Sequence, residues 1–303
     1  MSTSEAQAPA LNEAELKLLQ ALVYQECGMH FDERRTPFLL DRLQRRLKEC
    51  GLDSFYNYYR LLTSQQGKQE LARLLENLTV NETSFFRNKA QLDLFQHDSL
   101  EELLQRKQAA RDFSLRIWSA GCSTGQEPYT LAMLVGDALS YHNLRNPQPS
   151  YTSALPKPMV PSPWRLEILA SDISYSVLRA AQEGSYNEQQ MSAVDYGFRL
   201  RYFDKVGARY AIKKSVKELV HFDFHNLKTE YLPQRNDMIF CRNVMMYFDE
   251  AEQKRLVEKF YRCLNPKGFL FVGHAESLLG LTAKFQMVHR NAGTAYQRVE
   301  VAL

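Results

Sequence analysis

The sequence lacks the paired cysteines, the long apolar runs and the signal peptide that are typical of secreted, membrane-spanning or zinc-binding proteins. Its five cysteines are scattered and odd in number, without a C-x-x-C pair. This argues against a disulfide scaffold or a zinc ribbon and favours a reducing compartment, the cytoplasm. No apolar run approaches the roughly 20 residues that cross a bilayer, and the first ten residues lack the pattern of a secretory signal. The formal net charge is only +3, which does not by itself indicate a nucleic-acid partner.

What is present is an ordinary globular composition. Hydrophobic residues make up 45% and charged residues 24% of the 303 residues, enough to bury a core. At roughly 150 residues per domain, this length predicts about two domains. We expect a disordered tail at 1–10, a helical domain at 11–78, a linker with a connecting helix at 79–112 and an α/β domain at 113–303.

The first 78 residues carry helical patterns only. Thr36 is suited to cap a second helix, with Pro37 at its first turn and Gly51 at its left-handed end. Asp53 is suited to cap a third helix. The buried faces of four helices are predicted from leucine and aromatic spacing: Leu18, Leu19, Leu22 and Val23; Leu39, Leu40, Leu43 and Leu47; Phe55, Tyr58, Tyr59 and Leu62; and Leu71, Leu74, Leu75 and Leu78.

From about residue 113, short apolar runs alternate with helical patterns. This alternation predicts βαβ units and a mostly parallel sheet covered on both faces. The runs 285–290 and 294–301 flank a short turn and predict a closing antiparallel hairpin at the edge. The predicted strands lie at 115–120, 166–171, 219–224, 238–241 and 269–273, and the clearest helices at 129–139 and 252–264.

Two segments interrupt the alternation. Residues 145–164 hold six of the eleven prolines and predict a surface insertion without a core of its own. Residues 185–217 are rich in Tyr, Arg and Lys, and a Val-Gly-Ala turn at 206–208 separates two possible strands. We expect a small β-subdomain there.

The turn after the first predicted strand is the first chemical signal. Gly121 and Gly125 allow close approach of a ligand, or simply form a tight turn. The turn lacks the Gly-Lys-Ser/Thr of a phosphate-binding loop, and Glu127 would repel phosphate and attract a cation. Asp172 ends the second predicted strand, where an acid can accept hydrogen bonds from ribose or cap a helix. Together these features favour S-adenosylmethionine, a nucleoside with a cationic sulfur and no phosphate.

Five motifs in order make the chain resemble the CheR-type chemotaxis receptor glutamate methyltransferases. They are NETSFFR at 81–87, GCSTGQEPY at 121–129, ASDI at 170–173, FCRNVMMYF at 240–248 and GHAES at 273–277. The resemblance spans 11–300. It implies a Rossmann-like methyltransferase domain, with a small β-subdomain inserted in it, after an N-terminal all-helical domain.

The resemblance also implies the site. The cofactor S-adenosylmethionine, which becomes S-adenosylhomocysteine, would be bound by Asn81, Thr83, Arg87, Gly121, Glu127, Asp172, Asn226, Leu227, Arg242 and Asn243. Arg87, Arg242 and Tyr247 would face the methyl group and the substrate as the catalytic set. A glutamate carboxylate, with a reference pKa of about 4.3, is already ionised at neutral pH and can attack in line without a general base. The arginines then position this carboxylate.

A basic strip lies at 34–48, with six basic residues and one acidic residue. Arg42 and Arg46 are four apart and are expected on one flank of the second helix, with Arg45 on the adjoining exposed face. The strip is either a solvated helix face or a docking surface for an acidic partner. The resemblance implies the glutamate-rich helical bundle of a chemoreceptor. The family's β-subdomain can hold a tethering receptor peptide, but the stretch 203–220 looks short for this, so we expect direct docking.

Other chemistries are weighed and set aside. His221, Asp223 and His225 alternate on a predicted strand, but no further ligand cluster is evident, so we expect no metal. Cys122 has no neighbour in sequence that would lower its pKa.

A nucleic-acid methyltransferase and a non-catalytic cofactor-sensing adaptor stay open as alternatives. The former would use Arg199, Arg201, Lys205, Arg209, Lys213 and Lys214. We expect a monomer that binds no nucleic acid and does not insert into the membrane.

Overall fold

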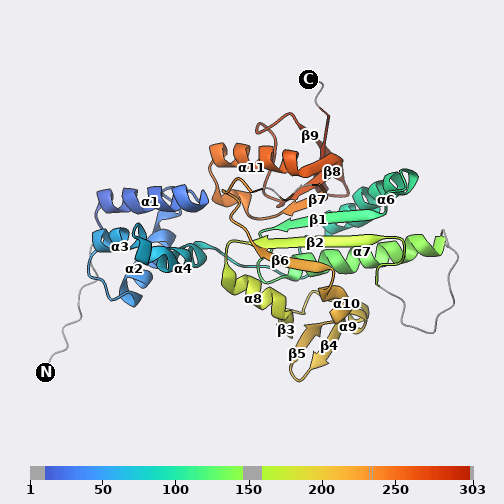
Figure 1. Cartoon of the computed structure of the whole chain (residues 1–303), viewed down its shortest axis with the longest axis horizontal. Helices are drawn as coiled ribbons and strands as arrows, with labels where there is room; N and C mark the ends of the chain where they lie inside the picture. Colours follow the sequence, from blue (N-terminus) through green and yellow to red (C-terminus); the bar gives the residue numbers. More distant parts are fainter. Residues whose placement is uncertain (1–10, 146–158, 232, 234, 301–303) are drawn as a thin grey trace. The chain divides into compact units, whose positions relative to one another are not determined.

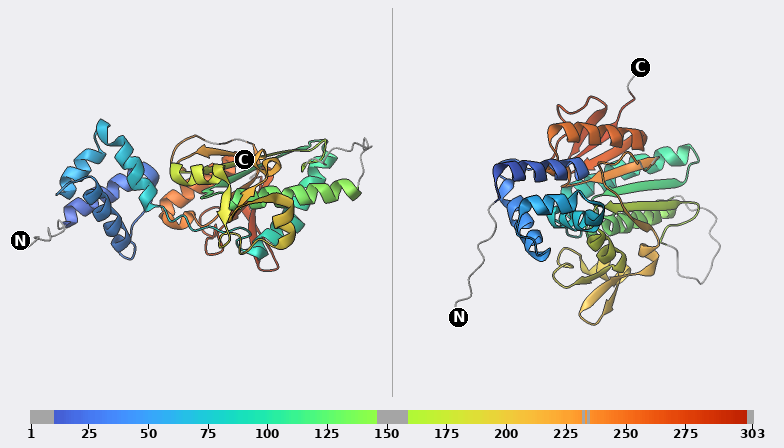
Figure 2. Two further views of the ribbon diagram at one scale, coloured as in Figure 1. Left: turned by 90° about the horizontal axis from the view of Figure 1, so that it is seen from below. Right: turned by 60° about the vertical axis from the view of Figure 1, so that its left-hand side comes forward.

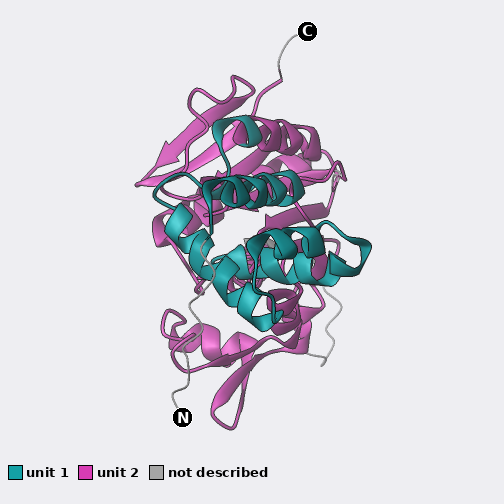
Figure 3. Ribbon diagram, turned by 90° about the vertical axis from the view of Figure 1, so that its left-hand side faces the viewer, with its two compact units in different colours: residues 1–80, 247–252 teal, residues 81–246, 253–303 magenta. Residues whose placement is uncertain are grey.

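The computed structural model describes residues 11–145, 159–231, 233 and 235–300. The chain divides into two compact units, which Figure 3 colours separately. Unit 1 comprises residues 1–80 and 247–252, and unit 2 comprises residues 81–246 and 253–303. The predicted tail at 1–10 and most of the predicted proline-rich insertion lie outside the described residues. In the part of the chain that is described, no helix combines the length and the apolar character needed to cross a membrane.

Unit 1 is built from helices, as the leucine spacing predicts. The helices are α1 (Glu13–Cys27), α2 (Thr36–Glu49), α3 (Phe55–Leu62), the short 3-10 helix η1 (Gln65–Gly67) and α4 (Lys68–Leu78). The core contains Leu19, Leu39, Leu43, Tyr58 and Leu74, all fully buried. This confirms the predicted helical class of the N-terminal segment.

Two of the predicted helix caps are wrong. Helix α2 has Arg35 at its cap position and no side-chain cap, because the hydroxyl of Thr36 donates to the carbonyl of Asp32 (2.8 Å). Helix α3 is capped by Ser54, whose hydroxyl accepts from the Asn57 N–H (3.4 Å), rather than by Asp53. The second error comes from the adjacent Asp53 and Ser54, which are both good capping residues. At α2 the helix begins one residue earlier than predicted, so Thr36 lies inside its first turn.

Unit 2 is organised around a seven-stranded sheet of order β6-β2-β1-β7-β8-β10-β9 (Figures 1 and 2). The strands β6, β2, β1, β7 and β8 run parallel, whereas β10 pairs antiparallel with both β8 and β9. This confirms the predicted mostly parallel sheet with an antiparallel edge hairpin. The strands are β1 (Ser114–Ala120), β2 (Arg165–Asp172), β6 (Val220–Phe224), β7 (Asn236–Cys241), β8 (Leu264–Val272), β9 (Phe285–Arg290) and β10 (Gly293–Arg298).

Helices and a second small sheet complete unit 2. The helices are α5 (Lys89–Leu94), the π-helical turn η2 (Phe95–Ser99), α6 (Leu100–Ala109), α7 (Gln126–Arg145), α8 (Tyr175–Glu183), α9 (Tyr196–Tyr202), α10 (Lys214–Lys217), the 3-10 turn η3 (Met245–Tyr247) and α11 (Glu250–Cys263). The small sheet has the order β3-β5-β4. Its strands are β3 (Ser185–Asn187), β4 (Phe203–Val206) and β5 (Arg209–Ile212), and the β4–β5 turn contains Gly207 with φ +58°.

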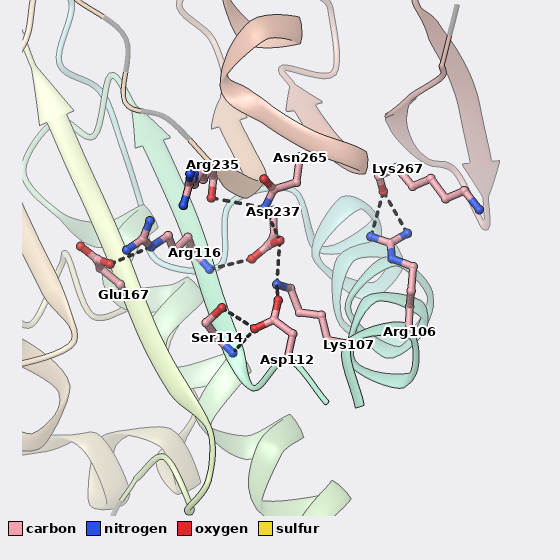
Figure 4. Close-up of polar contacts among 10 residues, drawn as sticks. All are labelled: Arg106, Lys107, Asp112, Ser114, Arg116, Glu167, Arg235, Asp237, Asn265 and Lys267. Carbon is pink, nitrogen blue, oxygen red and sulfur yellow. Dashed lines mark hydrogen bonds and ion pairs between the residues drawn. The ribbon is translucent and has the colours of Figure 1, made fainter. Parts of the chain in front are cut away.

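A partly buried ion cluster holds the amino-terminal ends of the central strands (Figure 4). The ammonium of Lys107 from α6 lies 2.7 Å from Asp112 and 3.0 Å from Asp237, the second residue of β7. Asp237 also accepts from the backbone N–H of Arg116 on β1 (2.9 Å). Burial alone would raise the pKa of Asp112, but hydrogen bonds from Lys107 and Ser114 lower it to about 2. The cluster therefore fixes β1, β7 and α6 at the edge opposite the chemical motifs.

Candidate functional site

The turn between β1 and α7 requires glycine at its start. Gly121 has φ +87°, and a Cβ at this position would lie 2.5 Å from Cγ2 of Val244. The N–H groups of Gly121 and Cys122 both donate to the carbonyl of Ser171 at the end of β2 (2.8 and 2.9 Å). The backbone at Gly121 therefore lies close to the end of β2 and to the segment that follows β7, as a tight turn. The approach of a ligand to this glycine stays a prediction.

Asp172 ties the second strand to this turn. Its carboxylate accepts from the N–H of Ser123 (2.9 Å) and from the N–H of Ser174 (3.0 Å), and the side chain is buried. Ser123 is itself in the left-handed region with φ 48°, a conformation that a non-glycine residue keeps only where its surroundings hold it. The predicted ribose acceptor therefore also shapes the loop, and Ser174, not Asp172, caps α8.

A buried ion pair joins the first turn of α7 to the end of β7. Nη1 of Arg242 lies 3.3 Å from Oε2 of Glu127, whose Oε1 accepts from the hydroxyl of Ser119 (2.7 Å). Nη2 of Arg242 donates to the carbonyl of Arg87 (2.5 Å). Burial lowers the pKa of Arg242, although Glu127 opposes this shift. Within the described part of the chain, Nε of Arg242 is buried and has no hydrogen-bond partner.

The segment 81–88 lies against the same turn. The hydroxyl of Ser123 donates to the carbonyl of Asn81 (2.9 Å), and the N–H of Phe86 donates to the hydroxyl oxygen of Thr130 (3.3 Å). The guanidinium of Arg87 donates to the carbonyl of Glu82 (3.0 Å), and Thr83 lies half-buried in the same segment. Asn81 therefore lies against the glycine turn, while Thr83 and Arg87 follow it in the same segment.

Asn226 and Leu227 follow β6 and are held from α11. Lys259 donates to the carbonyl of Leu227 (3.0 Å), and the side-chain oxygen of Asn226 accepts from the N–H of Lys228 (2.9 Å). Both residues are half-buried. Because β6 is parallel to β2, this segment leaves the sheet at the same edge as Asp172.

One functional residue was missed by the sequence reasoning. Glu276 lies in the GHAES motif, to which no role was given, and its carboxylate accepts from the N–H groups of Asn243 (2.9 Å) and Met246 (3.0 Å). Asn243, predicted to line the cofactor pocket, has φ 61°. The available signal was an acid three residues after a strand-ending glycine.

Tyr247 belongs to unit 1, whereas Arg87 and Arg242 belong to unit 2. The guanidinium carbon of Arg35 lies 4.9 Å from the centroid of the Tyr247 ring, and the Tyr247 carbonyl accepts from the N–H of His30 (2.9 Å). The three residues predicted to be catalytic are therefore not all gathered by contacts within one unit.

The basic strip is not uniformly exposed. Arg45 is exposed and pairs with Asp41 (3.1 Å), and Arg42 is half-buried with its guanidinium 4.8 Å from the Phe38 ring centroid. Arg46, which is predicted to share a flank of α2 with Arg42 and to contact the acidic partner, is instead buried. Its side chain is 8% exposed and Nε donates to Glu70 (2.9 Å). Because its guanidinium binds the buried carboxylate of Glu70, Arg46 stabilises the fold of unit 1 and is not exposed to a partner.

The structure also shows the surroundings of the residues considered for nucleic-acid binding, metal binding and thiol chemistry. Four of the six basic residues proposed as a phosphate strip already have acidic partners: Arg199 pairs with Glu188, Arg201 with Asp137, Lys213 with Asp204 and Lys214 with Glu218. His225 is buried against Trp118, and burial lowers its pKa. Burial raises the pKa of the Cys122 thiol well above its usual value. Among the described residues, no group of three His, Cys, Asp or Glu side chains could hold a metal ion.

Comparisons with known proteins point to one family. Residues 81–145 and 153–294 match the model of the CheR methyltransferase SAM-binding domain, and residues 14–79 match that of the CheR methyltransferase all-alpha domain. A chemotaxis protein methyltransferase of Borreliella burgdorferi is 33% identical over 88% of this chain and 89% of its own length. One of Escherichia coli is 32% identical over 92% of this chain and 89% of its own. Among solved structures, a magnesium protoporphyrin IX methyltransferase of Synechocystis is 13% identical with a TM-score of 0.31, covering 80% of this chain and 97% of that one.

Proposed function

The chain belongs to the CheR methyltransferase family and is an S-adenosylmethionine-dependent methyltransferase, and on this premise we propose that it methylates glutamate carboxylates of a chemoreceptor. The products are glutamate methyl esters and S-adenosylhomocysteine. The partner we propose is the acidic, helical cytoplasmic bundle of such a receptor, and the enzyme acts as a cytoplasmic monomer. The observation that carries the proposal is the buried Arg242–Glu127 pair beside the glycine turn at the carboxyl ends of the parallel strands.

The donor set fits this cofactor. Nε of Arg242 is a buried donor that has no partner among the described residues, and a Cβ at Gly121 would meet Val244. The carboxylate of Asp172 ends β2 and suits ribose hydroxyls, and the carboxylate of Glu127 at the start of α7 forms a nearly neutral pair with Arg242. These groups suit a ligand without a phosphate. We assign to the pocket Asn81, Thr83, Arg87, Gly121, Glu127, Asp172, Asn226, Leu227, Arg242 and Asn243, with no metal.

When bound, S-adenosylmethionine supplies an electrophilic methyl group on a positively charged sulfur. The chain's own residues orient and enclose the reactants. Arg242 is already paired with Glu127, so its charge is largely balanced and it directs a substrate carboxylate without binding it tightly enough to lower its reactivity. The guanidinium of Arg87 donates to the Glu82 carbonyl, and it suits the bidentate recognition of a carboxylate. Holding two reactants in register can contribute several kcal/mol, up to about 7–11 in ideal cases.

The chain needs no general base for this reaction. A glutamate carboxylate has a reference pKa of about 4.3 and is ionised at neutral pH. The substrate carboxylate is therefore the nucleophile. Cys122 in the glycine turn does not suit this role, because burial raises the pKa of its thiol. We assign Tyr247 a part in catalysis from the family resemblance, through its position five residues after Arg242 in the same loop.

A single transfer assay tests the function. Purified enzyme is incubated with methyl-labelled S-adenosylmethionine and receptor-bearing membranes, and the product is treated with mild alkali. We expect label to leave as volatile methanol, because carboxyl esters hydrolyse under these conditions. Label that stays on protein or nucleic acid would contradict glutamate methylation. No transfer, together with calorimetric binding of S-adenosylhomocysteine, would indicate the adaptor instead.

A further inference from the structure

Three backbone N–H groups converge on the carboxylate of Glu276. Oε2 accepts from Gly273 (2.5 Å) and Asn243 (2.9 Å), and Oε1 accepts from Met246 (3.0 Å). The N–H of Glu276 in turn donates to the carbonyl of Gly273 (2.9 Å). Both oxygens of one half-buried side chain therefore join the loop after β8 to the loop after β7.

The second of these loops, residues 242–246, carries two of the residues assigned to the cofactor pocket. Asn243 has φ 61°, a left-handed conformation that persists in a non-glycine residue only where surrounding contacts hold it. The contact is also close, since a Cβ at Gly273 would lie 2.8 Å from the N of Asn243 and 2.7 Å from Oε2 of Glu276. Glycine at 273 thus makes room for the carboxylate to reach the loop.

We propose that Glu276 is a positioning residue of the methyl-transfer site, which fixes the 242–246 loop and thereby the places of Arg242 and Asn243. The inference rests on the proposed function and gives a role to a residue of the GHAES motif, to which the resemblance assigns none. Hydrogen bonds to a charged acceptor are stronger and more directional than those between neutral groups. A displacement of about 1 Å at a reacting centre can lower a rate on the order of 10²-fold. Glu276 acts through the loop and touches no reactant.

The bonding pattern requires two acceptor oxygens. Glutamine has nearly the shape of glutamate, but one of its oxygens is replaced by an NH₂ donor, which would face a backbone N–H. Aspartate keeps both acceptors on a shorter side chain. The structure therefore ranks the variants: Glu276→Asp keeps more of the function than Glu276→Gln, although glutamine is closer in size. A role in packing alone would give the opposite order.

The test compares these variants with His274→Ala, a matched control at an exposed position in the same loop. We expect Glu276→Gln to lower kcat for receptor methylation at least tenfold while the receptor KM stays within twofold. We expect Glu276→Asp to recover part of kcat and His274→Ala to match the wild type. Hydrogen exchange of the Asn243 and Met246 amides should accelerate in Glu276→Gln, but not in His274→Ala.

Wild-type kcat and wild-type exchange in Glu276→Gln would overturn the proposal. So would a Glu276→Asp variant that is less active than Glu276→Gln. If Glu276→Gln does not fold, the kcat and exchange rates of Glu276→Asp decide, since a shortened clamp should show smaller changes of the same sign. A wild type that binds S-adenosylhomocysteine but transfers no methyl group would refute the proposed function. The exchange rates would then still decide whether Glu276 holds the loop.

Discussion

Replacement of Arg46 by methionine should destabilise unit 1 far more than the same change at Arg45. Arg46 and Glu70 are 8% and 9% exposed, and they form two contacts with each other, one of them from Nε to Oε1 at 2.9 Å. The hydroxyl of Tyr58 donates to the same Glu70 oxygen (2.8 Å). In Arg46→Met the Glu70 carboxylate would remain buried with the Tyr58 hydroxyl but without its cation.

The expected loss is about 3 kcal/mol, the lower end of the roughly 3–5 kcal/mol measured when one partner of a buried ion pair is removed. The lower end applies because Arg46 also pairs with the half-exposed Glu49, which gives part of the network access to water. Arg45, in contrast, is 50% exposed and pairs with the 61% exposed Asp41. A surface pair of this type contributes about 0.3–0.5 kcal/mol.

The assay uses the distribution of tryptophan in the whole protein. The sequence has two tryptophans, and both Trp118 and Trp164 belong to unit 2. Far-ultraviolet circular dichroism therefore reports both units in a urea titration, while tryptophan fluorescence reports unit 2. With a slope of about 1–3 kcal/mol per molar urea, a 3 kcal/mol loss should move the helical phase of unit 1 by about 1–3 M to lower urea.

The pH dependence gives a second check. Burial would raise the pKa of Glu70, but hydrogen bonds from Arg46 and Tyr58 outweigh this and lower it. A carboxylate with a lowered folded pKa stabilises the fold above its unfolded value, and this stabilisation is lost as the pH falls through the folded pKa. The advantage of the wild type over Arg46→Met should therefore shrink in acid. Equal urea midpoints for Arg46→Met and Arg45→Met at neutral pH would refute the reasoning.

The remaining predictions concern ligand binding and docking. Gly121→Ala should weaken S-adenosylhomocysteine binding at least tenfold in calorimetry, because the new Cβ would lie 2.5 Å from Val244. Gly207→Ala is the control, since Gly207 also has a positive φ but no atom of the described residues lies within 4 Å of the new Cβ. We expect this control to leave the affinity unchanged. Equal affinities for the two variants would contradict this. The double variant Arg42→Glu with Arg45→Glu should raise the receptor KM at least tenfold and leave the cofactor affinity unchanged. Both side chains reach the surface of α2, where the proposed acidic partner would bind. An unchanged KM would show that α2 is not part of the docking surface.

The sheet was predictable because its strands are buried on both faces. β7 is buried along its whole length and β1 over most of it, and such strands appear in a sequence as continuous apolar runs. The strand ends were less predictable, since β8 begins at Leu264, five residues before the predicted start. That first part of β8 includes Pro266 and Lys267, which do not belong to an apolar run.

The burial of Arg46 was partly visible in the sequence. Leu39, Leu43 and Arg46 follow the spacing of one helix face, so the pattern places Arg46 among the buried leucines. What the sequence could not show is the partner, because Glu70 lies 24 residues away on α4. Without a partner in view, an arginine is expected at the surface, and the charge count of the strip then outweighed the helical spacing.

At the cofactor site, too, the sequence predicts where a charged residue lies but not which residue it pairs with. The strand-turn-helix pattern predicted that Glu127 would stand at the edge where ligands bind in parallel sheets, and its negative charge was taken to select a cationic ligand. In the structure Glu127 already has a cation, Arg242, 115 residues further along the chain. The preference for a ligand without phosphate therefore does not follow from a lone carboxylate. It follows from a nearly neutral, buried pair, beside which an added phosphate would be desolvated without gaining the charge of Arg242, because Glu127 already balances that charge.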